Sequence, residues 1–178
     1  MKYFEWIVWF LCLAAGSNGP NGGSSSQDAF FQTLSQLCGA RFEGQATFPG
    51  DPNDPFAGKL LVAEVSMCQP DEIRIPFAVG EDRSRTWILK RGTEGLSLKH
   101  DHRHADGTPD TITMYGGWAI EGGSAHSQSF AADEHTAELI PEAVTNVWTL
   151  SFDPDKNTLT YDLKRHGKPR FKAVLKRK

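Results

Sequence analysis

The chain has no excess of basic charge. Its 178 residues include 19 lysines and arginines against 22 aspartates and glutamates, so the formal net charge is −3. A nucleic-acid-binding protein needs a basic face to neutralise phosphates, and this balance gives no electrostatic reason to expect a nucleic-acid partner. The short basic run at residues 176–178 is typical of a solvated end and does not change this interpretation.

Long apolar runs are also scarce. The run at residues 7–15 has the length of a signal-peptide core and is too short to cross a bilayer. With small residues at Ala15 and Ser17, it predicts a signal peptide over residues 1–17. The alternative is an apolar N-terminal helix that stays on the protein. The first interpretation predicts a secreted or periplasmic protein with no stable membrane insertion after the leader is removed.

Cysteine is scarce as well. Of the three cysteines, Cys12 lies in the predicted leader, so a mature chain keeps Cys38 and Cys68. An even number of cysteines in an exported protein suggests a disulfide. If the turn of the first hairpin centres on Asn53, Cys38 lies opposite Cys68, and a disulfide is geometrically reasonable. The alternative is a pair of buried free thiols.

Long helical patterns are absent after the first forty residues. Residues 18–27 have the composition of a flexible linker. Asp28 then predicts the N-cap of a short helix over residues 29–37, where Phe30, Leu34 and Leu37 share one face. We expect residues 28–178 to form a single domain.

Alternation of apolar and polar residues replaces the helical pattern from Gly39 onward. Ten short strands, separated by turn residues, are predicted at residues 41–48, 59–67, 72–79, 86–91, 95–104, 111–119, 125–130, 146–152, 158–164 and 170–175. Because no long helix lies between them, parallel crossover units are not expected. The sequence therefore predicts an all-β antiparallel meander that closes into a roughly ten-stranded barrel with one short N-terminal helix.

The last three strands test this prediction. Residues opposite each other in an antiparallel pair must share a face. If Trp148 pairs with Leu163, two further apolar pairs form between the same two strands. A short loop at residues 166–168 then places the apolar residues of the last strand opposite those of the middle one. The resulting inward residues are Trp148, Leu150, Phe152, Leu159, Tyr161, Leu163, Phe171, Ala173 and Leu175. These layers are what a barrel wall requires.

Histidine follows leucine in the alternation of residues 96–104. Successive side chains of a strand point to opposite faces, so one face carries Leu96, Leu98, His100, His102 and His104. The leucines must face a core. The histidines should therefore continue the same row toward the mouth of the barrel.

A hairpin between residues 96–104 and 111–119 separates apolar from polar side chains in one register. In that register Trp118 lies opposite Leu96, Met114 lies opposite His100, and Tyr115 falls on the outer face. With two aromatic side chains from other strands, the candidate ligand-binding residues are His100, His102, His104, Trp118, Met114, Trp87 and Tyr161.

Three roles are open for the histidines. Histidines at i and i+2 on one strand face stand about 6–7 Å apart and could share a divalent metal, zinc or iron. The metal-ligand set would be His100, His102, His104 and Asp106. Alternatively, the histidines form a hydrogen-bonded network that orders the barrel mouth, with Asp101 and Arg103 paired outside. The third role is an exposed hairpin tip.

Two resemblances accompany these patterns. The short helix, the segment Gly39-Ala40-Arg41-Phe42-Glu43-Gly44 and the following meander resemble the calycin group, which includes lipocalins, fatty-acid-binding proteins and nitrobindin-like barrels. This likeness is architectural and implies a barrel with an interior ligand site. Residues 99–110 are similar to part of a cupin motif, with His-x-His followed by an acidic residue and a glycine.

These observations favour an exported calycin-like barrel that binds a small or apolar ligand in its interior, oriented by the histidines. The first alternative is a metal-dependent enzyme with hydrolase, isomerase or cupin-like oxygenase chemistry at His100 and His102. The second alternative is a structural or interaction barrel with a filled core. Whether the protein is an enzyme stays open at this point.

Overall fold

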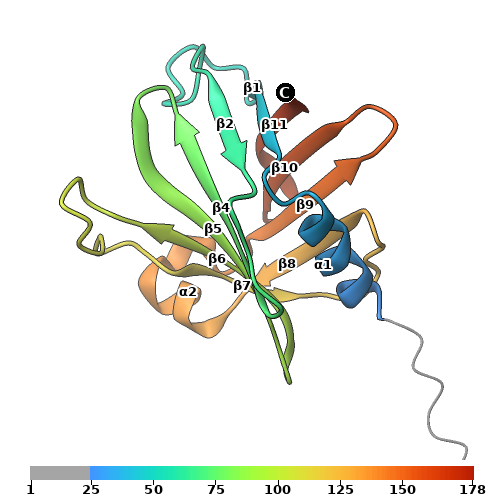
Figure 1. Cartoon of the computed structure of the whole chain (residues 1–178). Coiled ribbons are helices and arrows are strands. Elements are labelled where there is room, and N and C mark those ends of the chain that lie inside the picture. Colours follow the sequence, from blue (N-terminus) through green and yellow to red (C-terminus); the bar gives the residue numbers. More distant parts are fainter. Residues whose placement is uncertain (1–24) are drawn as a thin grey trace, which may run out of the picture.

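Strands with alternating inward side chains form the wall of a closed antiparallel barrel (Figure 1). The computed structural model describes residues 25–178, so the predicted signal peptide and most of the predicted linker lie outside the described residues. The strands are β1 (Arg41–Phe48), β2 (Leu61–Glu64), β3 (Met67–Cys68), β4 (Glu72–Val79), β5 (Asp82–Gly92), β6 (Gly95–His102), β7 (Tyr115–Ala119), β8 (Ser127–Ala132), β9 (Val147–Asp153), β10 (Thr158–Arg165) and β11 (Lys168–Arg177).

The barrel closes through β2, which pairs with both β1 and β4. Every other neighbouring pair in the order β1-β11-β10-β9-β8-β7-β6-β5-β4-β3 is antiparallel. Together β2 and β3 take the place of the single strand expected at residues 59–67. The predicted ten-strand wall is therefore confirmed, with one strand interrupted at Val65 and Ser66.

The register predicted for the last three strands is confirmed. Trp148 pairs with Leu163 and Leu163 with Phe171, and the two further layers follow. The β10–β11 turn is tighter than expected, because Arg165 pairs with Lys168 and a β-bulge follows in β11. The extra residue in this bulge is Arg170, which lines the cavity.

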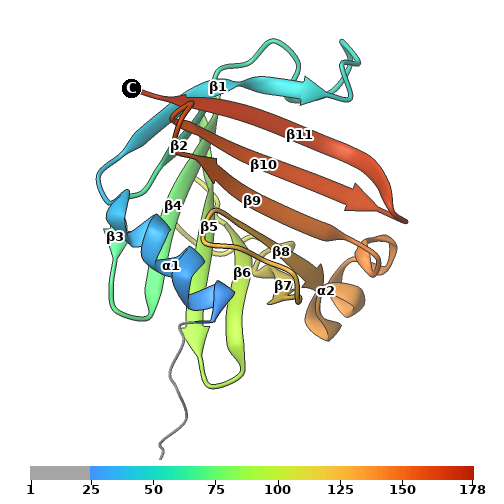
Figure 2. The ribbon, with the colours of Figure 1, turned by 90° about the vertical axis from the view of Figure 1, so that its right-hand side faces the viewer.

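A short helix, α1 (Ser26–Gln36), packs Phe30, Phe31 and Leu34 into one end of the core. It starts earlier than predicted, because the Ser25 hydroxyl, and not Asp28, accepts the first-turn hydrogen bond. The last residues of the segment expected to be a linker are consequently helical. Figure 2 shows α1 at one end of the barrel and the β10–β11 hairpin at the other.

The predicted disulfide joins Cys38, just after α1, to Cys68 in β3. Their Cα atoms lie 6.1 Å apart, within the usual range for a disulfide. The register argument behind the prediction was one residue off, since Arg41 pairs with Glu64. The disulfide thus fastens the helix to the barrel outside the β1–β2 ladder.

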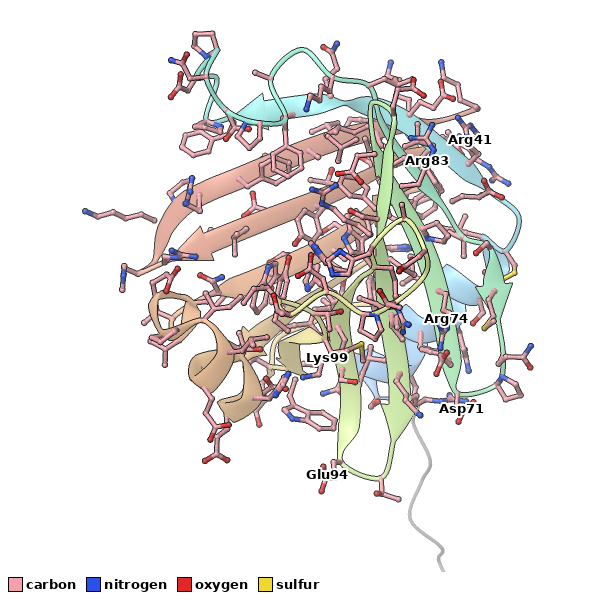
Figure 3. All side chains as sticks on the ribbon, turned by 90° about the vertical axis from the view of Figure 1, so that its left-hand side faces the viewer. Arg41, Asp71, Arg74, Arg83, Glu94 and Lys99 are labelled. Carbon is pink, nitrogen blue, oxygen red and sulfur yellow. A yellow bond between two sulfur atoms is a disulfide. The ribbon has the colours of Figure 1, made fainter. Side chains whose placement is uncertain are left out.

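A second short helix, α2 (Glu134–Leu139), and the 3-10 turn Pro141–Ala143 lie between β8 and β9. Asp133 caps α2 by accepting from Thr136 N at 3.0 Å and forms an ion pair with Lys99. Lys99 extends from the outer side of β6, and Figure 3 labels it. The Thr136 hydroxyl donates to the Gly116 carbonyl at 2.7 Å, which holds α2 against β7.

No helix within residues 25–178 is long and apolar enough to cross a membrane.

Removing the disulfide should destabilise the fold without changing it. The bond closes a loop of 30 residues, which in the chain-entropy model stabilises the folded state by about 3–4 kcal/mol. We expect a Cys38→Ser/Cys68→Ser variant to lose about that much free energy of unfolding in urea titrations. Reductant should destabilise the wild-type protein and leave the double variant unchanged. Equal stability of the two proteins would contradict the prediction.

Candidate functional site

The barrel interior holds a cavity of about 290 Å³ whose lining includes residues of the β10–β11 hairpin. This volume is at the lower end of the range typical of small-molecule sites. Its aromatic walls come from Phe56, Phe77, Trp87, Tyr115, Trp148, Tyr161 and Phe171, and its polar lining includes Arg85, His100, His102, Asn146, Arg165 and Arg170. The cavity therefore combines an apolar interior with a few polar groups.

His100 forms the polar centre of the cavity wall and is only 3% exposed. Its Nδ1 lies 3.1 Å from the Tyr115 carbonyl oxygen, which can only accept, so Nδ1 carries the proton and donates. Its Nε2 lies 2.7 Å from the Tyr161 hydroxyl. Since Nε2 of that neutral tautomer can only accept, the Tyr161 hydroxyl donates to it. One imidazole thus joins β6, β7 and β10 across the interior.

Stacked rings support this hydrogen-bonded centre. Tyr161 stacks on Trp87 with ring centroids 4.6 Å apart, and Trp87 stacks on Phe77 at 4.4 Å. On the other side of the histidine, the His100 ring stacks on Tyr115 at 4.8 Å. Such packing limits the rotamers of both tyrosines, so their hydroxyl groups have defined positions.

His102 lies one step nearer the mouth, opposite Arg85 in the β5–β6 ladder. Its Nε2 is 3.1 Å from the Tyr115 hydroxyl, within hydrogen-bond distance. Both His102 and Arg85 line the cavity. Arg85 forms an ion pair with Asp82, and its guanidinium lies 5.8 Å from the centre of the Phe56 ring. A cationic group thus marks the outer end of the site.

Burial keeps the two histidines and the two tyrosines of the cavity uncharged at neutral pH. It lowers the pKa of His100 to about 3 and, together with the nearby Arg85 charge, also lowers the pKa of His102. Burial raises the pKa of Tyr115 to about 12 and raises the pKa of Tyr161 well above its usual value. The interior end of the site is therefore polar but neutral.

Two of the predicted ligand-binding residues, Trp118 and Met114, lie outside the cavity. Trp118 is 40% exposed and Met114 is 37% exposed, because the β6–β7 register differs by one residue from the predicted one. Tyr115 pairs with His100, and its ring enters the cavity instead. The physical reason is that Met114 has a positive φ of 58°, which breaks the alternation just before β7 begins.

The other predicted residues divide into two groups. His100, His102, Trp87 and Tyr161 come together in the cavity wall. His104 is exposed and lies outside the cavity, on the excursion between β6 and β7. That excursion folds back on β6, where the backbone N–H of Met114 donates to the His100 carbonyl at 2.7 Å.

The predicted metal-ligand set does not assemble. Both ring nitrogens of His100 are engaged by Tyr115 and Tyr161, and His104 and Asp106 are exposed outside the cavity. Among residues 25–178, no group of three or more His, Cys, Asp or Glu side chains is placed to hold a metal ion. The residues present do not fit a zinc or iron site.

The pairing of Asp101 with Arg103 that one open alternative placed outside the barrel is present, as part of a set of polar contacts on the outer face of β6. Arg103 Nε donates to both Asp101 carboxylate oxygens at 3.0 Å, and the Thr113 hydroxyl donates to Asp101 at 3.1 Å. The same Thr113 oxygen accepts from the His102 backbone N–H at 2.7 Å. This network holds the excursion against β6 and thereby positions Tyr115.

Among the cavity residues that sequence reasoning missed are Tyr115, Arg85, Arg165 and Arg170. Arg85 shares the strand face of Trp87, two residues away, and Arg165 shares the face of Tyr161 and Leu163. Period-two counting could have found these two arginines. Tyr115 and Arg170 depend on local irregularities of the backbone, so alternation alone does not reveal them.

Comparisons with known proteins identify no relative: no family model, no curated protein and no solved structure matches the chain. The closed antiparallel barrel is compatible with a calycin-like fold. The function must therefore be inferred from the geometry of the site.

The low pKa of His100 predicts loss of stability in mild acid. Its pKa is about 3 in the folded protein and close to 6.5 when unfolded, so the unfolded chain takes up the proton first as pH falls. Between pH 7 and pH 5 this linkage removes about 2 kcal/mol of stability. We expect urea titrations to show that the free energy of unfolding of the wild type falls by about 2 kcal/mol more than that of His100→Gln between pH 7 and pH 5.

The exposed His135→Gln variant is the matched control and should keep the wild-type pH dependence. Protonation of His100 above pH 5 in an NMR titration of the folded protein would contradict the assignment.

Proposed function

We propose that this protein binds a small ligand with an apolar body inside its barrel. The observation that carries this proposal is a neutral histidine–tyrosine pair set in the aromatic wall of a cavity of about 290 Å³. A filled structural core needs neither the space nor the polar pair. Apolar pockets with a few fixed polar groups are typical of small-molecule sites.

The hydrogen-bonding capacity that remains at the cavity wall describes the ligand. The Tyr161 hydroxyl donates to His100 and keeps acceptor capacity on its oxygen. The second hydroxyl, on Tyr115, lies beside His102. A ligand with one O–H or N–H group on its inner end would satisfy Tyr161, while its apolar surface contacts Trp87 and Trp148. The histidines orient the tyrosines, and the tyrosines contact the ligand.

The same proposal includes a calycin-type relationship and a location outside the cytoplasm. The closed antiparallel meander and the short helix packed into one end of the barrel support the calycin-type relationship. The disulfide supports the location outside the cytoplasm, because such bonds persist in oxidising compartments. Of the alternatives, the metal-dependent enzyme has no supporting donor set among residues 25–178. An experiment must distinguish the ligand-binding barrel from a structural barrel without a ligand.

Binding of a neutral apolar dye tests the proposal. N-phenyl-1-naphthylamine fluoresces strongly when it enters an apolar site, and we expect the native protein to bind it saturably. Leu163 lines the cavity and is partly buried, so Leu163→Trp should fill the space and weaken binding about tenfold. The same substitution at Leu60, which is exposed and outside the cavity, should leave the affinity unchanged.

Mass spectrometry of an organic extract of the natively purified protein gives an independent measurement. A saturable dye site sensitive to Leu163→Trp, or a co-purified small molecule lost in that variant, supports the proposal. Absence of both would favour the structural barrel and sink the binding function.

A further inference from the structure

Three arginines line the cavity, with a single aspartate among the lining residues. They are Arg85, Arg165 and Arg170, and the aspartate is Asp54. The Asp54 carboxylate accepts from the backbone N–H of Phe56 at 2.9 Å. The whole chain has a net charge of −3, so this concentration of positive charge at one cavity runs against the overall balance. A local excess of one charge in a cleft attracts ligands of the opposite sign.

Arg165 is held at the cavity by a neutral partner. It follows Tyr161 and Leu163 on the inner face of β10, and its Nε donates to the Asn146 side-chain oxygen at 2.9 Å. Asn146 is only 4% exposed, so this contact is fixed by a buried group. No carboxylate of residues 25–178 lies within ion-pair distance of Arg165. Its outer N–H groups therefore have no internal counter-charge.

Arg170 reaches the same cavity through the β-bulge in β11. In the β10–β11 ladder Leu163 pairs with Phe171 and Lys164 pairs with Pro169, so Arg170 is the extra residue without a partner. Bulges redirect side chains and occur often beside functional sites. Both Arg170 and its neighbour Phe171 line the cavity, which strict alternation would forbid. In the described part of the chain, Arg170 also has no ion-pair partner.

We propose that Arg165 and Arg170 form an anion subsite, and that the ligand is a carboxylate with a flat apolar body. The proposal rests on the binding function proposed above and specifies the ligand class. A guanidinium matches a carboxylate with two parallel hydrogen bonds. The apolar surroundings strengthen that attraction relative to bulk water. The acid group lies at the hairpin end of the cavity, and the ring system lies between the aromatic walls.

Two probes of nearly the same shape test the charge. 2-Naphthoate carries a carboxylate, and 2-naphthamide replaces it with a neutral amide. Isothermal titration calorimetry at pH 7.5 and low salt should give the wild-type protein at least about a tenfold preference for the naphthoate, as a charge-assisted pair implies. Raising the salt concentration should reduce this preference by screening and leave the affinity for naphthamide nearly constant.

Substitutions assign the preference to the two arginines. Arg165→Gln/Arg170→Gln should lose most of the naphthoate preference, because its affinity for naphthoate falls much more than its affinity for naphthamide. Because Arg165 has a structural contact with Asn146, the exposed Arg170→Glu variant provides a second test that does not disturb that contact. It should weaken naphthoate binding much more than naphthamide binding. Arg177→Gln, on the same strand but outside the cavity, is the matched control and should keep the wild-type preference.

The outcomes separate the two proposals. Equal wild-type affinity for the two probes would overturn the anion subsite while the binding function stands. A naphthoate preference that survives in both arginine variants would overturn the assignment to Arg165 and Arg170. Failure of both naphthalene probes and of the neutral dye to bind would reject the binding function and the subsite with it.

Discussion

The structure of the site depends on one buried, neutral histidine. His100 donates to the Tyr115 carbonyl and accepts from the Tyr161 hydroxyl, so it connects strands that are far apart in sequence. A buried polar group without partners destabilises a fold strongly, whereas a fully paired one specifies a single arrangement. The uncharged state is required here because burial disfavours the imidazolium form and lowers the pKa. The positions of both tyrosines follow from that requirement.

Charge is distributed along the cavity in a defined order. The inner end is neutral, since the pKa values of its histidines are lowered and those of its tyrosines are raised. Three arginines line the same cavity, and of these only Arg85 has a carboxylate within ion-pair distance in the described chain. A ligand that complements this charge distribution would place an uncharged polar group beside the histidines and tyrosines and an acid group beside the arginines. The same order disfavours cations, which would meet guanidinium groups without compensating carboxylates.

The sequence predicted most of the barrel, because regular alternation and turn residues are local signals. The register of β9, β10 and β11, the disulfide and the inward row from Leu96 to His102 are confirmed. The start of α1 was wrong because Ser25 competes with Asp28 as the cap, and both residue types cap helices well. The inward positions of Arg85 and Arg165 follow from the same alternation that places Trp87 and Tyr161 inside.

Tyr115 and Met114 show why the rest could not be predicted. A one-residue change of register moves every side chain of a strand to the opposite face. The observed register follows from the positive φ of Met114 and from two glycines. A Cβ at Gly116 would lie 2.0 Å from the Leu98 carbonyl oxygen, and one at Gly117 would lie 1.6 Å from that of Ala131. These close approaches depend on strands distant in sequence, so no local pattern encodes them. The residue that completes the site is thus determined by the barrel as a whole.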